Sequence, residues 1–277
     1  MPRLQLSFHG TFAFKKEDIL KILHTASEPT ALDDSLENLM RRTGLGNQKV
    51  KPMISWASRA GLIKNKRLTS EGKFILQCDH YLESINTDWL MHFYLSFGDK
   101  GLQLPPEKIV DWGGWSYFIY TFLPQNQSFT TDELQNHSSL VFEQEQPQSL
   151  SKNFRIILRS YTESHALSAC RFLIKKGQEY ESGNALLPNP YLIGYFLAKL
   201  WERDYQKQGS ILTQLILTQK MGLAPILGVN LEKLQEQLNT LEAYGIIEQR
   251  RTVSPFQIVP RWDDPLILLE KAYESDQ

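Results

Sequence analysis

Apolar positions recur at helical spacing through the first part of the chain. Residues 15–26 and 34–43 each carry an apolar face with i, i+3, i+4 spacing, which predicts two helices. Gly44-Leu45-Gly46 ends the second one, because glycine adopts the left-handed conformation that closes a helix. Asn47 is expected to cap a third helix that Gly61 stops. Its apolar stripe comprises Val50, Met53, Ile54, Ala57 and Ala60.

Short strands are predicted on both sides of this helical segment. Residues 62–63 and 68–69 would pair through a turn at Asn65-Lys66-Arg67. Two adjacent helices, the second amphipathic and followed by a small hairpin, have the outline of a winged-helix module. Residues 1–10 alternate apolar and polar positions, which predicts one more strand laid against the module.

Aromatic residues dominate the middle of the chain. Helices are predicted at residues 88–95 and 116–122, and Trp89, His92 and Phe93 should lie near one face of the first. The second could stack nucleic-acid bases, but it lacks interleaved Lys or Arg, so we favour a helix buried on all sides.

The remaining pattern is helical with one more hairpin. A capped helix begins near residues 129–134, and a polar loop at 143–149 is the best hinge in the middle of the chain. Three further helices are predicted at residues 150–161, 191–205 and 231–244, with a turn-rich connection at 177–190 between the first two. The predicted hairpin strands are residues 246–250 and 256–259, and an acidic tail helix follows at 263–277.

The predicted fold class is therefore mainly α with small β-hairpins. We divide the chain into an N-terminal winged helix at 1–78, an aromatic-rich helical middle at 79–209, and a C-terminal winged-helix-like unit at 210–277. The last unit repeats the helix, glycine and hairpin order of the first, but its helix is nearly charge-balanced. A structural or protein-binding role suits it better than a second DNA contact.

Composition and cysteine content predict a cytosolic protein. A hydrophobic content of 42% and a charged content of 22% are ordinary for a soluble globular protein. Its two cysteines cannot form a disulfide framework or a four-cysteine zinc site. The N-terminus lacks the apolar core of a signal peptide, and no run is long enough to span a membrane. We expect no membrane association.

Charge is concentrated on the predicted third helix and its hairpin. Residues 41–73 hold nine basic residues and one acid, in a chain of formal charge −1. Clustered charge of this kind suits contact with duplex DNA, the helix facing the major groove and the turn meeting phosphate. The predicted DNA-binding residues are Arg41, Arg42, Gln48, Lys49, Lys51, Ser55, Arg59, Lys64, Lys66 and Arg67. The alternative is a solvated face on a module that binds only protein.

A second basic face lies on the predicted helix at 150–161. Lys152, Arg155 and Arg159 fall outside its apolar stripe. They could make a further phosphate contact or form an ordinary solvated face, and the sequence does not decide between the two.

Catalytic and metal-binding chemistry has little support in the sequence. Asp88 and His92 are four residues apart on a predicted helix, as two metal ligands would be, but no second pair is visible, so a structural hydrogen bond is favoured. His9 is expected to pack or hydrogen-bond. Asp79, Asp88 and Asp111 are too scattered to indicate a nuclease site. No cofactor is expected, and a divalent metal only if the protein nicks DNA.

Several segments are unusual enough to identify a family. The chain resembles the bacterial "domain of unknown function 4007" family in order and spacing over most of its length. The matching segments are Thr43–Asn47 through Ala57, Gly61–Ile63, Leu68–Gly72, Tyr81–Glu83, Thr87–His92, Trp115–Phe118 and Phe129–Leu134. Where the family tends to have Gly-His-Glu-Thr-Phe, this chain has Phe8-His9-Gly10-Thr11-Phe12, so it lacks the glutamate that acid chemistry there would need.

The resemblance implies a component of a DNA phosphorothioation or related defence system, which would present duplex DNA to the modifying enzymes or nick it. One relative with this domain is regarded as a DNA nickase. Cysteine desulfurase and other sulfur-modification proteins would be partners, and a homodimer is a further option. The alternatives are a protein-interaction adaptor and a transcriptional regulator without catalysis.

Overall fold

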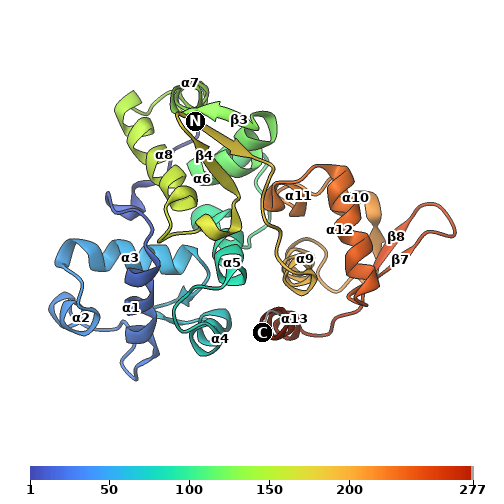
Figure 1. The fold of residues 1–277 in the computed structure, drawn as a ribbon, viewed down its shortest axis with the longest axis horizontal. Helices are drawn as coiled ribbons and strands as arrows, with labels where there is room; N and C mark the ends of the chain where they lie inside the picture. The colour runs from blue at the N-terminus through green and yellow to red at the C-terminus, as the bar shows by residue number, and fades with distance from the viewer. Residues whose placement is uncertain (276–277) are drawn as a thin grey trace.

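Three helices and a short hairpin open the chain, in the predicted order. The structure is a computed structural model that describes residues 1–275, and Figure 1 shows its elements. The first elements are α1 (Lys16–Ser27), α2 (Leu36–Thr43), α3 (Asn47–Arg59), β1 (Ile63–Lys64), β2 (Arg67–Leu68) and α4 (Ser70–Cys78). Strands β1 and β2 pair antiparallel. Helices α1 to α3 and the hairpin agree with the sequence prediction, α4 was not predicted, and the interpretation as a winged helix remains a prediction.

The cap of α3 differs from expectation. Asn47 is the first residue of the helix, and Gly46 takes the cap position with an extended backbone. Glycine is among the residues tolerated at an N-cap, so the helix starts one residue earlier than predicted. Pro52 is the sixth residue of α3, past the first turn, so it removes the backbone donor that the Gln48 carbonyl would otherwise have, and the expectation that it lies among the free first-turn amides is wrong.

Two glycines hold the hairpin against its neighbours. A Cβ on Gly72 would lie 2.1 Å from the carbonyl oxygen of Leu62, so no larger residue fits this close backbone approach. Gly61 has φ +77°, and a Cβ there would lie 2.4 Å from the ring of Tyr94 on α5 (Ile85–Leu95). The turn after α3 is thereby fixed against α4 and α5.

Helix α5 lies at the centre of the molecule. Residues 86–93 are all buried, and the ring of Phe93 stacks on Phe196 of α9 (Pro190–Asp204) with centroids 4.4 Å apart. The expectation of one apolar face is too narrow, since this helix is enclosed on every side.

The aromatic segment after α5 also belongs to the core. The side chains of Trp115, Phe118 and Phe122 are at most 2% exposed. They lie on α6 (Gly114–Tyr117) and the π-helical turn η4 (Phe118–Phe122), with the 3-10 turns η2 (Gly98–Lys100) and η3 (Ile109–Trp112) before them and η5 (Leu123–Gln125) after them. The buried-helix interpretation is confirmed, and these rings offer no surface for stacking bases.

A three-stranded antiparallel sheet was not predicted. Its order is β3-β5-β4, with Phe129 opposite Tyr180. Its strands are β3 (Ser128–Thr130), β4 (Leu173–Lys176) and β5 (Glu179–Ser182), and α7 (Thr131–Val141), α8 (Pro147–Thr162) and the short turn η6 (Ser168–Cys170) lie between β3 and β4. Residues 177–190 were expected to be a connection only. The strands are short and charged, so their apolar pattern is weak and their pairing depends on distant contacts.

The C-terminal part contains a second small sheet. Strand β6 (Ile211–Leu212) pairs with β8 (Gln257–Pro260), which also pairs with β7 (Ile247–Arg250). The helices between β6 and β7 are α10 (Thr213–Leu217), α11 (Leu223–Leu227) and α12 (Leu231–Ala243). Helix α12 and the β7–β8 hairpin match the prediction, and Asn230 caps α12 by accepting from the Lys233 amide at 2.8 Å.

The last helix, α13 (Pro265–Glu274), is part of the core and not an acidic tail. It packs along α9, as Figure 1 shows, and also contacts α4. Leu268, Leu269 and Ala272 are buried. Its apolar positions have helical spacing, so burial of this face outweighs the acidic residues around it.

The first residues do not form the expected strand. Residues 1–6 have no regular structure, and the 3-10 turn η1 (Ser7–His9) follows them. The Leu4 carbonyl accepts from the Gly114 amide at 2.7 Å, and the Leu4 and Leu6 side chains are buried. This segment therefore packs on the aromatic region through its apolar side chains.

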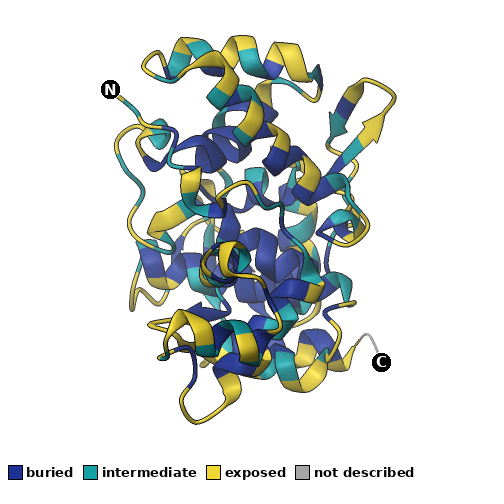
Figure 2. Cartoon of the chain, turned by 90° about the vertical axis from the view of Figure 1, so that its left-hand side faces the viewer, coloured by how far each residue is buried: buried dark blue, intermediate teal, exposed yellow. Residues whose placement is uncertain are grey.

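Buried side chains form one continuous cluster through all three predicted units. Figure 2 shows them filling the middle of the molecule, with exposed residues on the outer turns. The division at residues 78 and 209 remains a prediction from the sequence. In the described part of the chain, no helix is both long and apolar enough to cross a membrane.

Candidate nucleic-acid interface

One face of α3 is open to solvent. Val50, Met53 and Ala57 are buried against the neighbouring helices, so the opposite face points outward. On that face Gln48 and Lys51 are exposed and Ser55 is half-buried. The sequence places these three side chains together, and the structure does the same.

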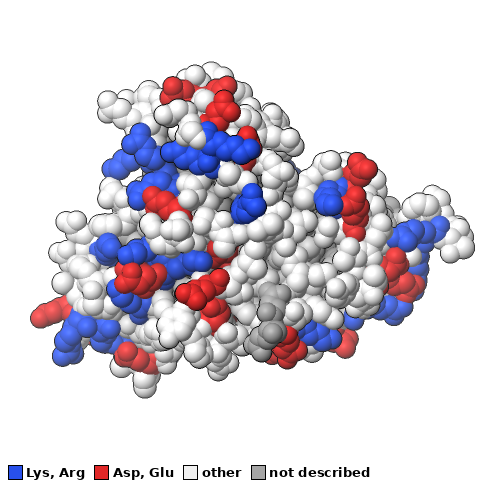
Figure 3. All heavy atoms as spheres, viewed as in Figure 1, with Lys and Arg blue, Asp and Glu red and all other residues white. Residues whose placement is uncertain are grey.

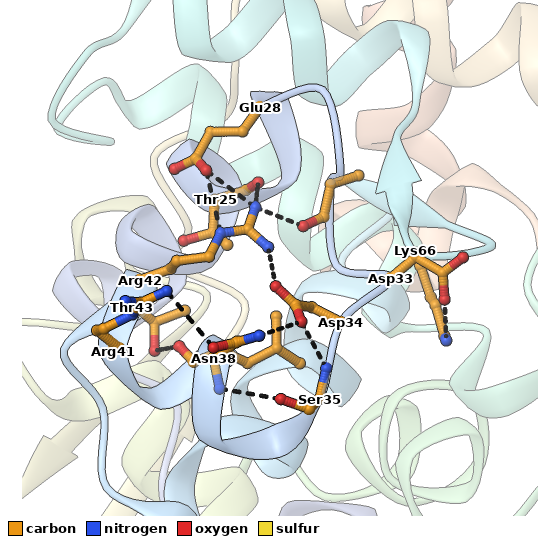
Figure 4. Close-up of polar contacts among 12 residues, drawn as sticks. Thr25, Glu28, Asp33, Asp34, Ser35, Asn38, Arg41, Arg42, Thr43 and Lys66 are labelled. Carbon is orange, nitrogen blue, oxygen red and sulfur yellow. Dashed lines mark hydrogen bonds and ion pairs between the residues drawn. The ribbon is translucent and has the colours of Figure 1, made fainter.

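Arg42 is turned into the module instead of outward. Its side chain is 13% exposed and forms ion pairs with Glu28 and Asp34. The same guanidinium donates to the carbonyl oxygens of Thr25 at 3.2 Å and Ala31 at 2.7 Å, as Figure 4 shows. It ties the connection between α1 and α2 to α2, so we exclude it from the DNA contacts.

Three other basic residues among the predicted DNA contacts form ion pairs with acids that lie outside residues 41–73. Lys49 pairs with Asp18 of α1 at 2.8 Å. Lys66 pairs with the exposed Asp33 at 2.8 Å. Arg59 pairs with Asp99, and its guanidinium lies 3.7 Å from the centroid of the Phe8 ring. These pairs reduce the charge that the sequence alone suggests, because their acids lie outside residues 41–73.

Four of the predicted cations remain exposed and, within residues 1–275, take part in no ion pair. They are Arg41, Lys51, Lys64 and Arg67. Lys64 and Arg67 oppose each other in the β1–β2 register, and the turn residues Asn65 and Lys66 have positive φ. The hairpin thus presents two cations at its tip, which lies against the loop between α1 and α2, where the Leu32 amide donates to the Lys66 carbonyl at 3.2 Å.

A second basic surface lies on α8. Lys152, Arg155 and Arg159 are exposed, and Figure 3 shows Lys and Arg gathered where Figure 1 places this helix. Arg159 pairs with Glu163, one turn further along. Lys152 and Arg155 have no ion pair in the part of the chain that the structure describes. The amphipathic spacing in the sequence predicts this basic face, but it does not decide between a phosphate contact and an ordinary solvated face.

The segment around His9 lies between these two surfaces. Gly10 packs against Pro52 of α3, and a Cβ there would be 3.2 Å from the proline ring. On the other side, Ser7, His9 and Gly10 line a hollow with Lys152 of α8. Residues 7–11 therefore connect the α3 region to the basic face of α8.

Asp88 and His92 do not form a metal site. Asp88 is fully buried and pairs with Lys16 at 2.6 Å. Burial raises the pKa of Asp88 to about 6, against the influence of Lys16. His92 is held by the Tyr161 hydroxyl at 2.7 Å and the Ile226 carbonyl at 2.8 Å. Both groups are structural, as the favoured alternative stated.

The ring of His92 is neutral at ordinary pH. Burial lowers the pKa of His92 to about 4. A neutral ring can donate to the Ile226 carbonyl through Nε2 and accept from Tyr161 through Nδ1. Its role is to join α5 to α8 and α11.

The scattered aspartates do not converge. Asp79 accepts hydrogen bonds from Thr87 at 2.6 Å and from the backbone amides of Glu83 and Ser84. Asp88 is buried, and Asp111 is exposed on η3. Among residues 1–275, no three His, Cys, Asp or Glu side chains lie close enough to hold a metal ion.

The fold is that of a mainly helical protein, with exposed cations on α3, on the hairpin and on α8. The chain belongs to the DUF4007 family of proteins of unknown function, whose model matches residues 6–265. Two SspB crystal structures, one of them magnesium ion-bound, are similar to it. Each has a TM-score of 0.73 and 18% sequence identity, covering 97% of this chain and 87% of that chain. The comparison with curated proteins gave no match.

The magnesium ion in that relative raises the question of ligands here. Magnesium favours an octahedral set of oxygen ligands, often one or two carboxylates completed by water or phosphate. The buried Asp88 is occupied by Lys16, and Asp79 by three hydrogen bonds. The described residues do not fit a dedicated magnesium site, and we derive no reaction step from one.

Proposed function

We propose that this protein binds duplex DNA as a cytoplasmic component of a bacterial DNA phosphorothioation or related defence system. The observation that carries the proposal is the group of exposed cations on α3 and the hairpin that form no ion pair among residues 1–275, Lys51, Lys64 and Arg67. Lys and Arg side chains release counterions from DNA when they neutralise its phosphates, which favours binding, and a cation outside an ion pair is available for this contact. The family resemblance supports the phosphorothioation context.

The proposed binding mode follows a winged helix. Helix α3 would enter the major groove, where Gln48, Lys51 and Ser55 can reach base edges or phosphates. The tip of the hairpin, with Lys64 and Arg67, would meet the backbone beside the groove, and Arg41 would add a contact from α2. Lys49, Arg59 and Lys66 stay in the contact region as paired residues.

Presentation of DNA suits the described residues better than cleavage. Strand cleavage needs clustered metal ligands or an activated nucleophile with its base. The three aspartates considered lie apart or are held in structural contacts. We therefore propose that the chain positions DNA for partner enzymes, with a cysteine desulfurase and other sulfur-modification proteins as the first partners to test.

A binding experiment on the full chain tests the proposal. A fluorescent duplex is titrated at 100 mM salt with wild type and with the combined variant Lys51→Ala, Lys64→Ala, Arg67→Ala. Each phosphate contact contributes about 0.9 to the steepness of the plot of log affinity against log salt, and its contribution vanishes near 1 M salt. At 100 mM salt, one decade lower, the loss of three contacts should therefore weaken binding about 500-fold. The matched control removes the same charge elsewhere, through Lys108→Ala, Lys207→Ala and Lys233→Ala. Equal losses in both variants, or no binding by wild type at low salt, would contradict the proposal.

A protein-interaction adaptor is the second candidate. The loop between β7 and β8 exposes Val253 by 77% and Phe256 by 50%. Apolar side chains at an exposed tip suit a protein partner better than DNA. This candidate takes precedence if wild type fails to bind the duplex.

A further inference from the structure

We infer that the groove between residues 7–11 and the N-terminal half of α8 binds a backbone phosphodiester of the same duplex that α3 contacts. The inference rests on the proposed function and extends the DNA-binding surface beyond the predicted winged helix. It assigns a role to the α8 cations that the sequence left open.

The groove consists of two adjoining hollows. One has a volume of about 450 Å³ and is lined by Thr11, Lys152, Arg155 and Arg159. The other, of about 320 Å³, lies against Ser7 and His9. Gln148 and Lys152 line both, so the two hollows form one continuous depression along α8.

The start of α8 favours a negative ligand. Helix α8 begins at Pro147 without a side-chain cap and without an acid in its first turn. The amides of Gln148 and Ser149 therefore keep the unsatisfied donors of a helix N-terminus, where the helix dipole is positive. Lys152 and Arg155 follow on the exposed side and add full charges without an ion-pair partner in the described chain.

His9 supplies an independent sign that the groove takes a ligand. Its side chain is 2% exposed, and neither ring nitrogen has a hydrogen bond of normal geometry within residues 1–275. A buried polar ring without such a bond is costly, and it borders the hollow that Lys152 shares. A phosphodiester oxygen would provide an acceptor at this wall.

The electrostatics of His9 agree with a positive groove. The pKa of His9 is lowered to about 4, chiefly by burial and to a smaller extent by the charges of Lys152 and Arg59, while the nearby Asn153 side chain acts in the opposite direction. Arg59 belongs to α3 and Lys152 to α8, so both helices contribute positive potential at one point. No acid is among the groups that shift this pKa.

The groove is also placed to share a ligand with α3. Gly10 packs on Pro52, the neighbour of Lys51, while Thr11 lines the larger hollow. Residues 10 and 11 therefore lie between the two basic surfaces, and both are small and uncharged. A nucleic-acid backbone can continue from one surface to the other.

The test measures DNA affinity as a function of salt for Lys152→Ala combined with Arg155→Ala in the full chain. Loss of two phosphate contacts should reduce the steepness of the log–log salt slope by about 1.8 and weaken binding about 60-fold at 100 mM salt. The control pair Lys207→Ala with Lys233→Ala changes the charge equally. Circular dichroism and a thermal melt verify folding, and Lys152→Gln with Arg155→Gln replaces the pair if the first variant is misfolded.

The outcomes separate the inference from the proposed function. If the α3 and hairpin variant loses affinity while the α8 variant matches wild type in affinity and slope, the inference is wrong and the proposed function stands. If wild type itself binds no duplex at low salt, both are overturned. A loss in the α8 variant equal to that of the control pair also contradicts the inference, because it would reflect net charge alone.

Discussion

Arg42 and Lys51 look equivalent in the sequence, but the structure gives them different roles. Both are basic and lie within one charged stretch. Arg42 is half-buried among carbonyl and carboxylate acceptors, whereas Lys51 is exposed and, in the described chain, without an ion pair. The acids that decide this, Glu28 and Asp34, lie upstream of the basic stretch, so a local count of charge cannot separate the two residues.

Replacing Arg42 should therefore affect stability and leave DNA binding intact. Arg42→Ala removes the guanidinium that donates to the Ala31 carbonyl and, beside the Glu28 amide, to the Thr25 carbonyl, and we expect a loss of about 2 kcal/mol in the free energy of unfolding. Urea unfolding measures this loss. Lys51→Ala is the control, with stability unchanged within about 0.5 kcal/mol. A large loss of DNA affinity by folded Arg42→Ala would show that this residue does contact DNA.

His92 should make the protein sensitive to acid. Its pKa is about 4 when folded, against an ordinary value of about 6.5, so the unfolded chain binds more protons between these values. Stability is fully present above pH 6.5 and falls as pH is lowered, by about 2 kcal/mol at pH 5 for this residue. His9 acts in the same direction, and the raised pKa of Asp88 opposes it.

The measurement compares urea unfolding at pH 7 and pH 5 for wild type and His92→Gln. Glutamine can still donate to Ile226 and accept from Tyr161 but does not titrate. We expect its loss between the two pH values to be about 2 kcal/mol smaller than that of wild type. Equal losses in the two proteins would mean that folding does not lower the pKa of His92.

At the scale of elements, helices with a strong apolar periodicity could be predicted from the sequence. Short strands could not. Helices α1, α2, α3, α8, α9 and α12 were predicted close to their bounds because each carries a continuous apolar stripe. Strands β4 and β5 have four residues each with several charges, although Gly177 between them, at φ +62°, is a turn signal that could have identified the hairpin. Strand β3 joins them from about fifty residues away, and such pairing is not a local property.

The candidate site, too, could be predicted from the sequence only in part. The outward face of α3 follows from its apolar stripe, so Gln48, Lys51 and Ser55 could be selected from sequence. The groove at His9 could not, because it depends on packing between segments about 140 residues apart. Ion pairs that occupy Lys49 and Arg59 come from α1 and from Asp99, which are likewise distant.

The position of α13 gives a test at this scale. Leu269 is fully buried, whereas Ile267 is 47% exposed. Leu269→Ala should lower the free energy of unfolding by about 2–5 kcal/mol through lost burial and a cavity. Ile267→Ala, the control on the same helix, should cost clearly less. Similar small effects from both would indicate that α13 is a surface tail after all.

For the whole molecule, one core supports two basic surfaces. Helix α5 contacts α3 and α9, so the N-terminal helices and the C-terminal part pack on the same buried element. The fold is shared with SspB over 97% of the chain at 18% identity, and this likeness concerns the fold alone. The proposed function therefore rests on the surface chemistry of this chain, above all on the exposed cations that take part in no ion pair among residues 1–275.

The salt dependence of DNA binding tests this account most directly. If Arg41, Lys51, Lys64, Arg67, Lys152 and Arg155 each neutralise one phosphate, the log–log slope for wild type is about −5.4, a loss of about 2,000-fold between 50 and 200 mM salt. Replacing the three cations of α3 and the hairpin by alanine should bring the slope to about −2.7. A wild-type slope near zero, or a slope that is the same in wild type and variant, would contradict the claim that these cations hold DNA.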